Sequence, residues 1–493
     1  MQINNNSNTV QAFWVSLGSL FSFGFSLVSS MILSRYFLKE DYGTYKQVLY
    51  VYNTLLTIFT LGLPRAFSFY LPRVPLDEAK NLIKKLTNMF FLLGSVFSLL
   101  LFIFSPQIAI LLKNPELEPA LKIFSPVPLL MLPTMGLEGI LSTFRRTQFL
   151  TIYTISTRIL MLLCVALPVI VFKGGYIQAI VGFVIASFLS FVLALYFKNL
   201  PVRNAGNEKC RISYNEIFKF SFPLLYASLW GILISSSDQF FISRYFGTKV
   251  FAEFSNGWLQ LPFIGMITGA CATVLSPLYS KLAHESVDQK KEIYPIWMSV
   301  LEKSAKLIYP LLVYCWFFSD DLMIALYGKI YENSSIYFKI KLVVNLTSIM
   351  VYAPLIISIG KIKYYRDIHM YTALCLIALQ YIGIVIFKSP YVVAIISVIC
   401  SLGMTTAGLL LIAKYFNVKL SQTLPLKILL KIIVPSILIL SILRLLFNIY
   451  SINIFFVLPI SFTIYTVLYY CLSFPLKLNY LSIIKPLIFK TKI

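Results

Sequence analysis

Long apolar runs separated by short polar turns cover almost the whole chain. Each run is about 20 residues long, the length that a helix needs to cross the hydrocarbon core of a bilayer. Only helices satisfy their own backbone hydrogen bonds within such runs, whereas a transmembrane barrel would show short alternating segments. Fourteen spans are predicted, centred on 13–34, 47–70, 88–111, 121–142, 150–172, 177–197, 217–240, 252–276, 304–326, 338–359, 369–387, 391–413, 425–447 and 452–473.

The composition supports an all-α polytopic membrane protein. Hydrophobic residues make up 58% of the chain and charged residues 12%, and the mean hydropathy is +0.82. No basic segment precedes the first run and no A-x-A-like site follows it, so we interpret it as an uncleaved span. The net charge of +23 does not indicate a nucleic-acid partner, because the basic residues lie mainly in short loops, where they set topology.

A four-residue motif occurs twice, 209 residues apart. Ser34-Arg35-Tyr36-Phe37 closes the first span, and Ser243-Arg244-Tyr245-Phe246 closes the seventh. The same offset aligns Ser19 with Ser228, Ser26 with Ser235, Tyr42 with Phe251 and Tyr45 with Phe254. We interpret this pattern as two parallel repeats, and transporters of this construction usually bind substrate where the halves meet.

The repeat predicts three parts. Residues 1–199 form an N-lobe of spans 1–6. Residues 200–416 form a C-lobe of a polar linker and spans 7–12, and 417–493 add spans 13 and 14 and a basic tail. Loops on one side carry roughly twice as many Lys and Arg as loops on the other, which predicts that both termini are cytoplasmic. The mixed-charge segments PLDEAKNLIKKLTN and HESVDQKKEIYPIW are either short helices at the cytoplasmic face or solvated loops.

Serines recur at three- and four-residue steps on the first and seventh spans, so each set lies on one helix face. Such a stripe either permits close helix packing or lines a wet cavity. The first set is Ser19, Ser22, Ser26 and Ser29, and the second is Ser221, Ser228 and Ser235.

Several cations lie inside predicted spans, where they normally face a cavity or a partner. Arg158 is about 12 Å deep in span five at the helical rise, and Arg65 follows Pro64 near the end of span two. We predict that both line a substrate cavity. Arg35 and Arg244 end their spans, so they either snorkel to the headgroups or face each other across the cavity. Lys306, near the inner end of span nine, has the same two alternatives.

Two carboxylates also lie at membrane depth. Asp238 is two turns before Arg244, and Glu138 is seven residues before Arg145, which would put those two on one helix face. Each carboxylate either pairs with a cation or binds a coupling proton or sodium ion, since a carboxylate in low dielectric titrates near working pH.

The chain shows few signs of enzyme chemistry. It has no Gly-rich phosphate loop, no Walker motif and no C-x-x-C, so neither ATP hydrolysis nor a bound metal is predicted. No cofactor is expected besides a coupling H+ or Na+. Asp320-Asp321 on an outer loop is an acidic pair that a membrane glycosyltransferase could use.

The segments LSRYFLKEDYGTYKQ, LGLPRAFSFYLPR, DQFFISRYFGT and SPLYSKLA resemble those of bacterial polysaccharide flippases. These are the O-antigen and capsule exporters of the multidrug/oligosaccharidyl-lipid/polysaccharide superfamily. Leu38 stands where this family often has Gly, whereas the second copy of the repeat keeps Gly247. The resemblance implies two six-helix lobes around a cationic cavity. From the positions of the residues along the spans, we predict as substrate-binding residues Arg65, Arg158, Arg244, Arg35 and Lys306, and as ion-coupling residues Asp238 and Glu138.

The implied activity is the transfer of a polyprenyl-pyrophosphate-linked oligosaccharide to the outer leaflet of the bacterial cytoplasmic membrane by alternating access. Membrane lipids, a polysaccharide polymerase and its chain-length machinery are the implied partners. A multidrug exporter of the same superfamily is one alternative, although its substrates are usually cationic and intramembrane Arg and Lys outnumber Asp and Glu here. A membrane glycosyltransferase or polymerase is the other.

Overall fold

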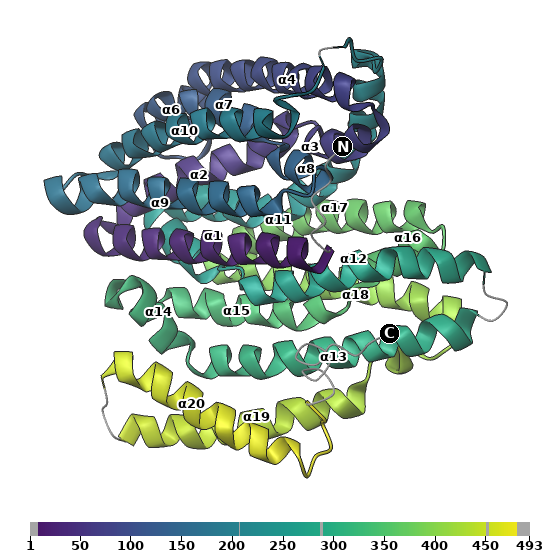
Figure 1. The fold of residues 1–493 in the computed structure, drawn as a ribbon. Helices are drawn as coiled ribbons and strands as arrows, with labels where there is room; N and C mark the ends of the chain where they lie inside the picture. Colours follow the sequence, from purple (N-terminus) through teal and green to yellow (C-terminus); the bar gives the residue numbers. More distant parts are fainter. Residues whose placement is uncertain (1–7, 207, 286–288, 450–452, 481–493) are drawn as a thin grey trace. The chain divides into compact units, whose positions relative to one another are not determined.

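The computed structural model describes residues 8–206, 208–285, 289–449 and 453–480, so the end of the predicted basic tail, 481–493, lies outside the described residues. Within that part of the chain every regular element is a helix (Figure 1), as the sequence predicts. Twelve of the described helices are long and apolar enough to cross a membrane, or up to fourteen if each of two bent pairs counts as one span. The chain is therefore a multi-pass membrane protein.

The described chain divides into two compact units, Met1–Ala252 and Glu253–Ile493. The helices of the first unit are α1 (Asn8–Tyr36), α2 (Lys39–Phe59), α3 (Pro64–Tyr70), α4 (Leu76–Ile103), α5 (Ser105–Leu111), α6 (Leu117–Phe124), α7 (Pro126–Met131), α8 (Leu137–Thr143), α9 (Thr147–Phe172), α10 (Tyr176–Asn199) and most of α11 (Tyr214–Gly257). Short 3-10 turns η1 (Leu71–Arg73), η2 (Leu132–Thr134) and η3 (Leu200–Val202) interrupt or end them.

The second unit holds α12 (Pro262–Glu285), α13 (Gln289–Phe317), α14 (Ser319–Tyr327), α15 (Ser334–Leu346), α16 (Tyr352–Ser358), α17 (Ile362–Phe387), α18 (Pro390–Phe416), α19 (Leu426–Ile449) and α20 (Ile454–Ser473). Its 3-10 turns are η4 (Lys329–Tyr331), η5 (Thr347–Ile349) and η6 (Leu420–Thr423). Along the sequence, the boundary between the compact units falls within α11. The repeat puts the lobe boundary at 199/200, so the division based on the repeat stays a prediction.

Packing in the first unit is dominated by α9, which lies between α1 and α10, while α4 packs on α7. Aromatic rings fill the interior: Tyr52 of α2 stacks on Phe97 of α4 at 6.0 Å between centroids, and Phe97 stacks on Phe59 at 4.4 Å. Such ring pairs add stability beyond the area that they bury. This packing fixes the scaffold on which the polar residues of α8 and α9 are held.

Proline divides several spans into shorter helices. Span four consists of α6, α7, η2 and α8, with Pro126 at the start of α7 and Pro133 within η2. A proline lacks a backbone N–H and clashes with the preceding turn, so it ends or bends a helix. Pro223 also lies inside a helix, α11, and this helix bends by 42° a few residues later, between Tyr226 and Ser228.

The repeat is visible in the backbone at Leu38 and Gly247. Leu38 precedes α2 with φ −61° and ψ 153°, and Gly247 interrupts α11 with φ 81° and ψ 179°. Both residues follow a copy of the repeated motif, and they are 209 positions apart. The segment after Gly247 is thus the counterpart of the start of α2, and the prediction of span eight at 252–276 was shifted, since α12 runs Pro262–Glu285.

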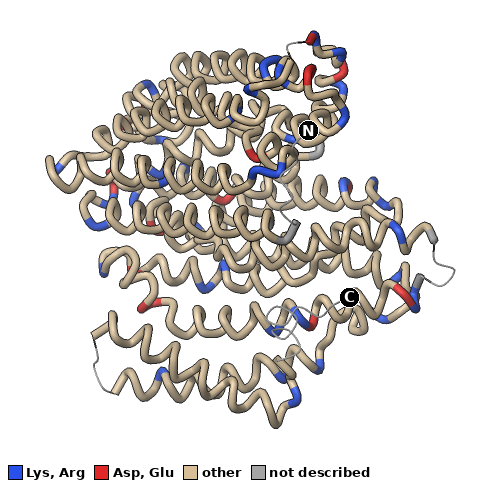
Figure 2. Tube along the Cα trace, in the orientation of Figure 1, with Lys and Arg blue, Asp and Glu red and all other residues tan. Residues whose placement is uncertain are grey.

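The first mixed-charge segment is not a separate surface helix, because it forms the beginning of the long helix α4. Its acidic residues hold the linker: Asp77 accepts a 2.9 Å hydrogen bond from the backbone N–H of Gly206, and Glu78 pairs with Arg211 at 3.2 Å. Within the second segment 286–288 lie outside the described residues, and its end is the beginning of α13. Figure 2 shows that charged residues gather toward helix ends, with long uncharged stretches between them.

The last two helices pack on α13 through tyrosine hydroxyls. Tyr465 of α20 donates to the carbonyl of Pro310 at 3.1 Å and to Ser436 of α19 at 3.0 Å. Tyr314 of α13 donates to the carbonyl of Leu458 at 2.8 Å. These bonds satisfy buried polar groups on three helices, so α19 and α20 form one body with the second unit.

Candidate functional site

A cavity of about 420 Å³ lies in the first unit, between α1, α8 and α9. The serine stripe of α1 forms one wall through Ser19, Ser22 and Ser26. Arg158 of α9 and Glu138 of α8 line the same cavity. The structure thus brings together two residues that the sequence proposed separately, beside the stripe that was predicted either to pack or to line a wet space.

Ser19, Ser22 and Ser26 of the stripe line the cavity, and the neighbouring Gly18 lies close to α9. Gly18 lies against Thr151 of α9, where an added Cβ would meet the Cα of Thr151 at 3.5 Å, and the Thr151 hydroxyl donates to the carbonyl of Trp14 at 2.7 Å. Ser19 donates back to the carbonyl of Val15 at 3.0 Å. A serine bonded in this way is satisfied within its own helix and still offers acceptor lone pairs to the cavity.

Arg158 supplies the cation of this cavity. Its side chain is exposed to the cavity, and the described residues provide no hydrogen bond or ion pair to it. The hydroxyls of Tyr52 and Tyr153 are near enough to act on it electrostatically. A guanidinium at membrane depth is tolerated where water or an anion can reach it, so this position fits a group that binds an anion.

Glu138 reaches the cavity because span four breaks just before it. Gly136 has φ +81°, a conformation that favours glycine, and α8 begins at the next residue. The predicted shared face of Glu138 and Arg145 was wrong, since α8 ends at Thr143 and Arg145 has φ 53° in the following turn. Glu138 therefore faces the cavity that Arg158 lines.

Lys198, at the end of α10, is a buried cation that the sequence analysis missed. Its ammonium donates to the carbonyl of Pro133 at 2.6 Å and to the Thr87 hydroxyl at 3.4 Å, and it lies 5.0 Å from the centre of the Phe67 ring. Only 1% of the residue is exposed. Because Lys198 holds η2, the turn that precedes α8, it supports the helix that carries Glu138. Its place directly after an apolar run was the signal in the sequence that could have identified it.

Arg65 does not line the cavity. It is the second residue of α3, its side chain is exposed, and it makes no hydrogen bond or ion pair with the described residues. However, α3 packs against α8, the helix that carries Glu138. The helix that carries Arg65 therefore lies beside the cavity wall, but the Arg65 side chain is not part of that wall.

The repeated motif takes part in a buried polar network in α11, just before the break at Gly247. Ser243 accepts a 2.6 Å hydrogen bond from Gln47 of α2, and Gln47 accepts one of the same length from Asn114. Arg244 donates to the carbonyl of Leu111 at the end of α5. Lys249 pairs with Glu40 at 2.6 Å. Arg244 thus has a partner within the first unit.

The remaining predicted residues lie apart from the cavity. Asp238 of α11 is buried at 3% exposure, and it acts electrostatically on the Tyr50 hydroxyl, which donates to the carbonyl of Ser236 at 3.3 Å. Arg35 is exposed in the last turn of α1. Lys306 of α13 is half-buried in the second unit, where its carbonyl accepts a hydrogen bond from Tyr480.

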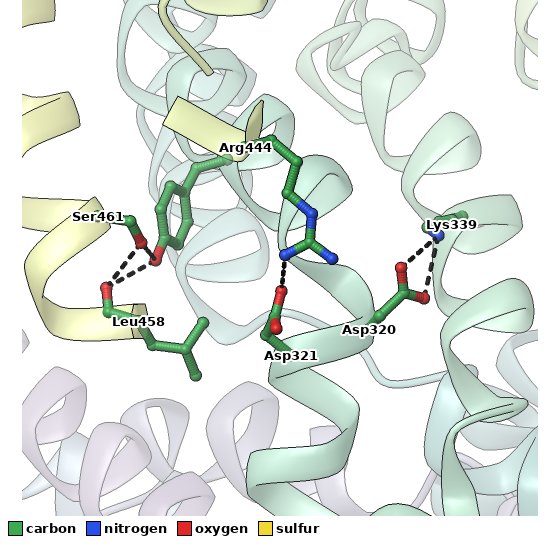
Figure 3. Close-up of polar contacts among 7 residues, drawn as sticks. Asp320, Asp321, Lys339, Arg444, Leu458 and Ser461 are labelled. Atoms are coloured by element: carbon green, nitrogen blue, oxygen red, sulfur yellow. Dashed lines mark hydrogen bonds and ion pairs between the residues drawn. The ribbon is translucent and has the colours of Figure 1, made fainter. Parts of the chain in front are cut away.

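The acidic pair on α14 is bound by two basic residues. Figure 3 shows Asp321 directed at Arg444 of α19 and Asp320 directed at Lys339 of α15. The two Lys339 bonds to Asp320 measure 3.0 and 3.1 Å. Since both carboxylates are engaged, the pair fits an anchor for three helices better than a free catalytic acid and base. No group of three His, Cys, Asp or Glu suited to a metal ion occurs in the described part of the chain.

A family model described as polysaccharide biosynthesis protein matches residues 32–336 of this chain. A search of curated proteins returned no match. Among solved structures, the chain is similar to the lipid II flippase MurJ in an inward closed conformation, with a TM-score of 0.72 and 17% identity over 96% of this chain and 99% of that one.

The chain is also similar to an inward-facing multidrug resistance MATE family transporter of the MOP superfamily, with a TM-score of 0.64 and 12% identity over 80% of this chain and 94% of that one. A MOP superfamily transporter from Pyrococcus furiosus gives a TM-score of 0.59 and 13% identity over 83% and 95% of the two chains. At these identities the similarities establish the fold.

Proposed function

Because this chain belongs to the polysaccharide biosynthesis protein family and has the fold of MOP-superfamily transporters, we propose that it is a lipid-linked oligosaccharide flippase. It moves a polyprenyl-pyrophosphate-linked oligosaccharide from the inner to the outer leaflet of the cytoplasmic membrane by alternating access. The product serves the synthesis of a surface polysaccharide such as O-antigen, capsule or exopolysaccharide.

The observation that carries this proposal is the cavity lined by Arg158, Glu138 and the serine stripe of α1. A guanidinium forms paired hydrogen bonds with phosphate oxygens, so Arg158 suits the pyrophosphate. The hydroxyls of Ser19, Ser22 and Ser26 suit the sugars, which exchange hydrogen bonds as donors and acceptors. The polyprenyl tail can stay in the bilayer during the transfer.

The other predicted cations have secondary roles in this proposal. Arg65, Arg35 and Lys306 would attract the anionic head electrostatically, because each is at least partly exposed. Arg244 would bind substrate only after it releases the carbonyl of Leu111. Binding through several moderate contacts allows release, which a transporter requires.

Transport would be driven by a proton or sodium gradient through Glu138 or Asp238. Glu138 shares a cavity with Arg158, so a cation bound to Glu138 would strengthen the field that holds the pyrophosphate. Asp238 is buried on α11, where its carboxylate is costly unless it is paired or binds a cation. The polysaccharide polymerase and its chain-length machinery are the proposed protein partners.

A multidrug exporter is the second candidate, supported by the similarity to MATE transporters. A membrane glycosyltransferase is less favoured because Asp320 and Asp321 are engaged with Lys339 and Arg444.

A deletion strain distinguishes the three functions. Loss of a flippase leaves complete lipid-linked repeat units in the inner leaflet, whereas loss of a transferase leaves none. Loss of a multidrug exporter raises retention of cationic dyes and leaves the surface polysaccharide intact. Normal polysaccharide without accumulated repeat units would contradict the proposal.

A further inference from the structure

An aromatic side chain, Phe23, takes part in the wall of the cavity in the first unit. It lies on α1 between Ser22 and Ser26 and is half-buried. Ser19, Phe23 and Ser26 follow one another at steps of four and three residues, so the ring projects from the same helix face as the serine stripe. Among the described residues that line this cavity, Phe23 alone is aromatic.

The ring of Phe23 has no aromatic or cationic partner among the described residues. Its neighbours on α1 do pair with one another. Phe21 stacks on Phe25 at 6.3 Å between centroids, and Phe13 meets Trp14 edge to face at 5.9 Å. An unpaired ring at a polar cavity keeps apolar surface exposed, and covering that surface is favourable. The ring is therefore available to a ligand.

Hydroxyl groups without a partner lie near this ring. The hydroxyls of Ser22, Ser26 and Thr154, all of which line the cavity, form no hydrogen bond with the described residues. Each can donate and accept. A sugar ring carries hydroxyls at its edge and C–H groups on its faces, and the weak positive charge of those C–H groups is attracted to the negative face of an aromatic ring. An aromatic ring beside free hydroxyls thus matches both parts of a sugar.

Phe23 and Arg158 lie at nearly the same depth along their helices. α1 and α9 are spans one and five, so they cross the membrane in the same direction, and Gly18 lies against Thr151. Phe23 is five residues, or about 8 Å, beyond Gly18. Arg158 is seven residues, or about 10 Å, beyond Thr151. A phosphate bound by Arg158 would therefore bring the sugar attached to it to the level of the ring.

We propose that Phe23 is the residue on which a sugar ring of the substrate stacks. This inference rests on the proposed flippase function and deepens it. The pyrophosphate contacts Arg158, and the sugar joined to it lies against Phe23, with its hydroxyls toward Ser22, Ser26 and Thr154. The cavity volume of about 420 Å³ is near the low end of the range for small-ligand sites. The cavity therefore holds the head and the adjoining sugar, while the remaining sugars extend beyond it.

The test compares two lipids that differ only in the sugar. Purified full-length protein is titrated with polyprenyl pyrophosphate and with the same lipid carrying one sugar (glucose, galactose or N-acetylglucosamine). Native mass spectrometry measures the bound lipid, and the ratio of the two Kd values gives the gain from the sugar. Phe23→Leu removes the ring, whereas Phe23→Trp keeps an aromatic face. Phe25→Leu is the control, because it removes a ring of the same helix that pairs with Phe21 and does not line the cavity.

We expect the sugar to strengthen binding to the parent protein. Phe23→Leu should reduce that gain about fivefold for the best-bound sugar, since contacts with an aromatic ring contribute about this factor. It should bind polyprenyl pyrophosphate as the parent does, and Phe23→Trp and Phe25→Leu should keep the gain. An unchanged gain in Phe23→Leu, an equal loss for both lipids, or no gain from any of the three sugars would overturn the proposal.

Phe23→Met replaces Phe23→Leu if the latter does not fold, as judged by gel filtration. The result is independent of the deletion strain. If that strain contradicts the flippase function while the sugar gain still depends on Phe23, the flippase function fails and the sugar site stands. If repeat units accumulate in that strain but Phe23→Leu keeps the full gain, the flippase function stands and the role of Phe23 fails.

Discussion

Arg158 and Lys198 are both cations within apolar helices of the first unit, but their surroundings indicate different roles. Lys198 is enclosed by a carbonyl, a hydroxyl and two aromatic rings, which leaves it no access to a ligand. Arg158 is open to a cavity with hydroxyls along one wall. At the residue scale, therefore, burial and partners separate a cation that holds structure from one that can bind substrate.

Replacement of Arg158 by Lys should lower export without loss of folded protein, and replacement by Ala should lower it further. Lysine keeps the charge but cannot form the paired hydrogen bonds that guanidinium makes with phosphate. Arg65→Lys should have a smaller effect, because Arg65 does not line the cavity. Export is compared at matched expression, with Arg203→Lys in the exposed linker as the control. Wild-type export in Arg158→Lys would remove the pyrophosphate role.

The neutral amides Glu138→Gln and Asp238→Asn test ion coupling. If either carboxylate carries the driving ion, its amide should reduce transport and flatten the dependence of transport on the proton or sodium gradient. Initial rates in proteoliposomes with imposed gradients provide the measurement. If both variants transport at the wild-type rate with the same gradient dependence, the two carboxylates have structural roles.

The sequence was sufficient to single out Arg158 and the serine stripe, because each follows from spacing and depth along one helix. It could not place Glu138 correctly, since the direction of that side chain depends on where α8 ends. The helix ends at Thr143, so Arg145 lies outside it and a spacing of seven residues no longer places Glu138 and Arg145 on one helix face. Contacts between helices, such as Lys198 with Pro133, depend on packing that spacing does not encode.

At the scale of elements, the helix is interrupted at the same position of each repeat, but by a different residue. Leu38 adopts an extended conformation that any residue tolerates, whereas Gly247 has φ 81° and ψ 179°, a region that is essentially restricted to glycine. No heavy atom lies within 4 Å of a Cβ placed on Gly247. The requirement for glycine there comes from the backbone alone.

We therefore expect Gly247→Ala to destabilise the protein by about 1–3 kcal/mol, the range for a residue held in such a conformation. Leu38→Ala at the equivalent repeat position should have little effect, since its backbone is relaxed. Thermal unfolding of the two purified variants would show a lower Tm for Gly247→Ala only. Equal unfolding temperatures would mean that the chain relieves the strain by moving the break.

The same break explains why span eight was displaced in the sequence analysis. The apolar residues Phe251, Ala252 and Phe254 belong to the end of α11, which continues past Gly247 to Gly257, and α12 begins only at Pro262. A window of apolar residues cannot detect a bend that one glycine dihedral produces. The repeat offset does detect it, because it aligns Gly247 with Leu38.

At the scale of the whole molecule, the all-helical fold and the spans followed from apolar run length. Orientation relative to the membrane is still a prediction from loop charges. A reporter fused after Lys209 should be active only if it is a cytoplasmic reporter, and one fused after Lys329 only if it is a periplasmic reporter. The reverse activities would invert the predicted topology.

The pair formed by Asp321 and Arg444 also imposes an order on biosynthesis. The ribosome makes the carboxylate 123 residues before its guanidinium, so α14 stays incompletely neutralised until α19 is inserted. A chain that ends at Leu424 should therefore be degraded quickly in pulse-chase experiments, and Asp321→Asn should prolong its lifetime. Equal lifetimes of the truncated chain with and without Asp321→Asn would mean that the stability of α14 does not depend on α19. On this view, insertion of α19, which supplies Arg444, is the step that completes the neutralisation of α14.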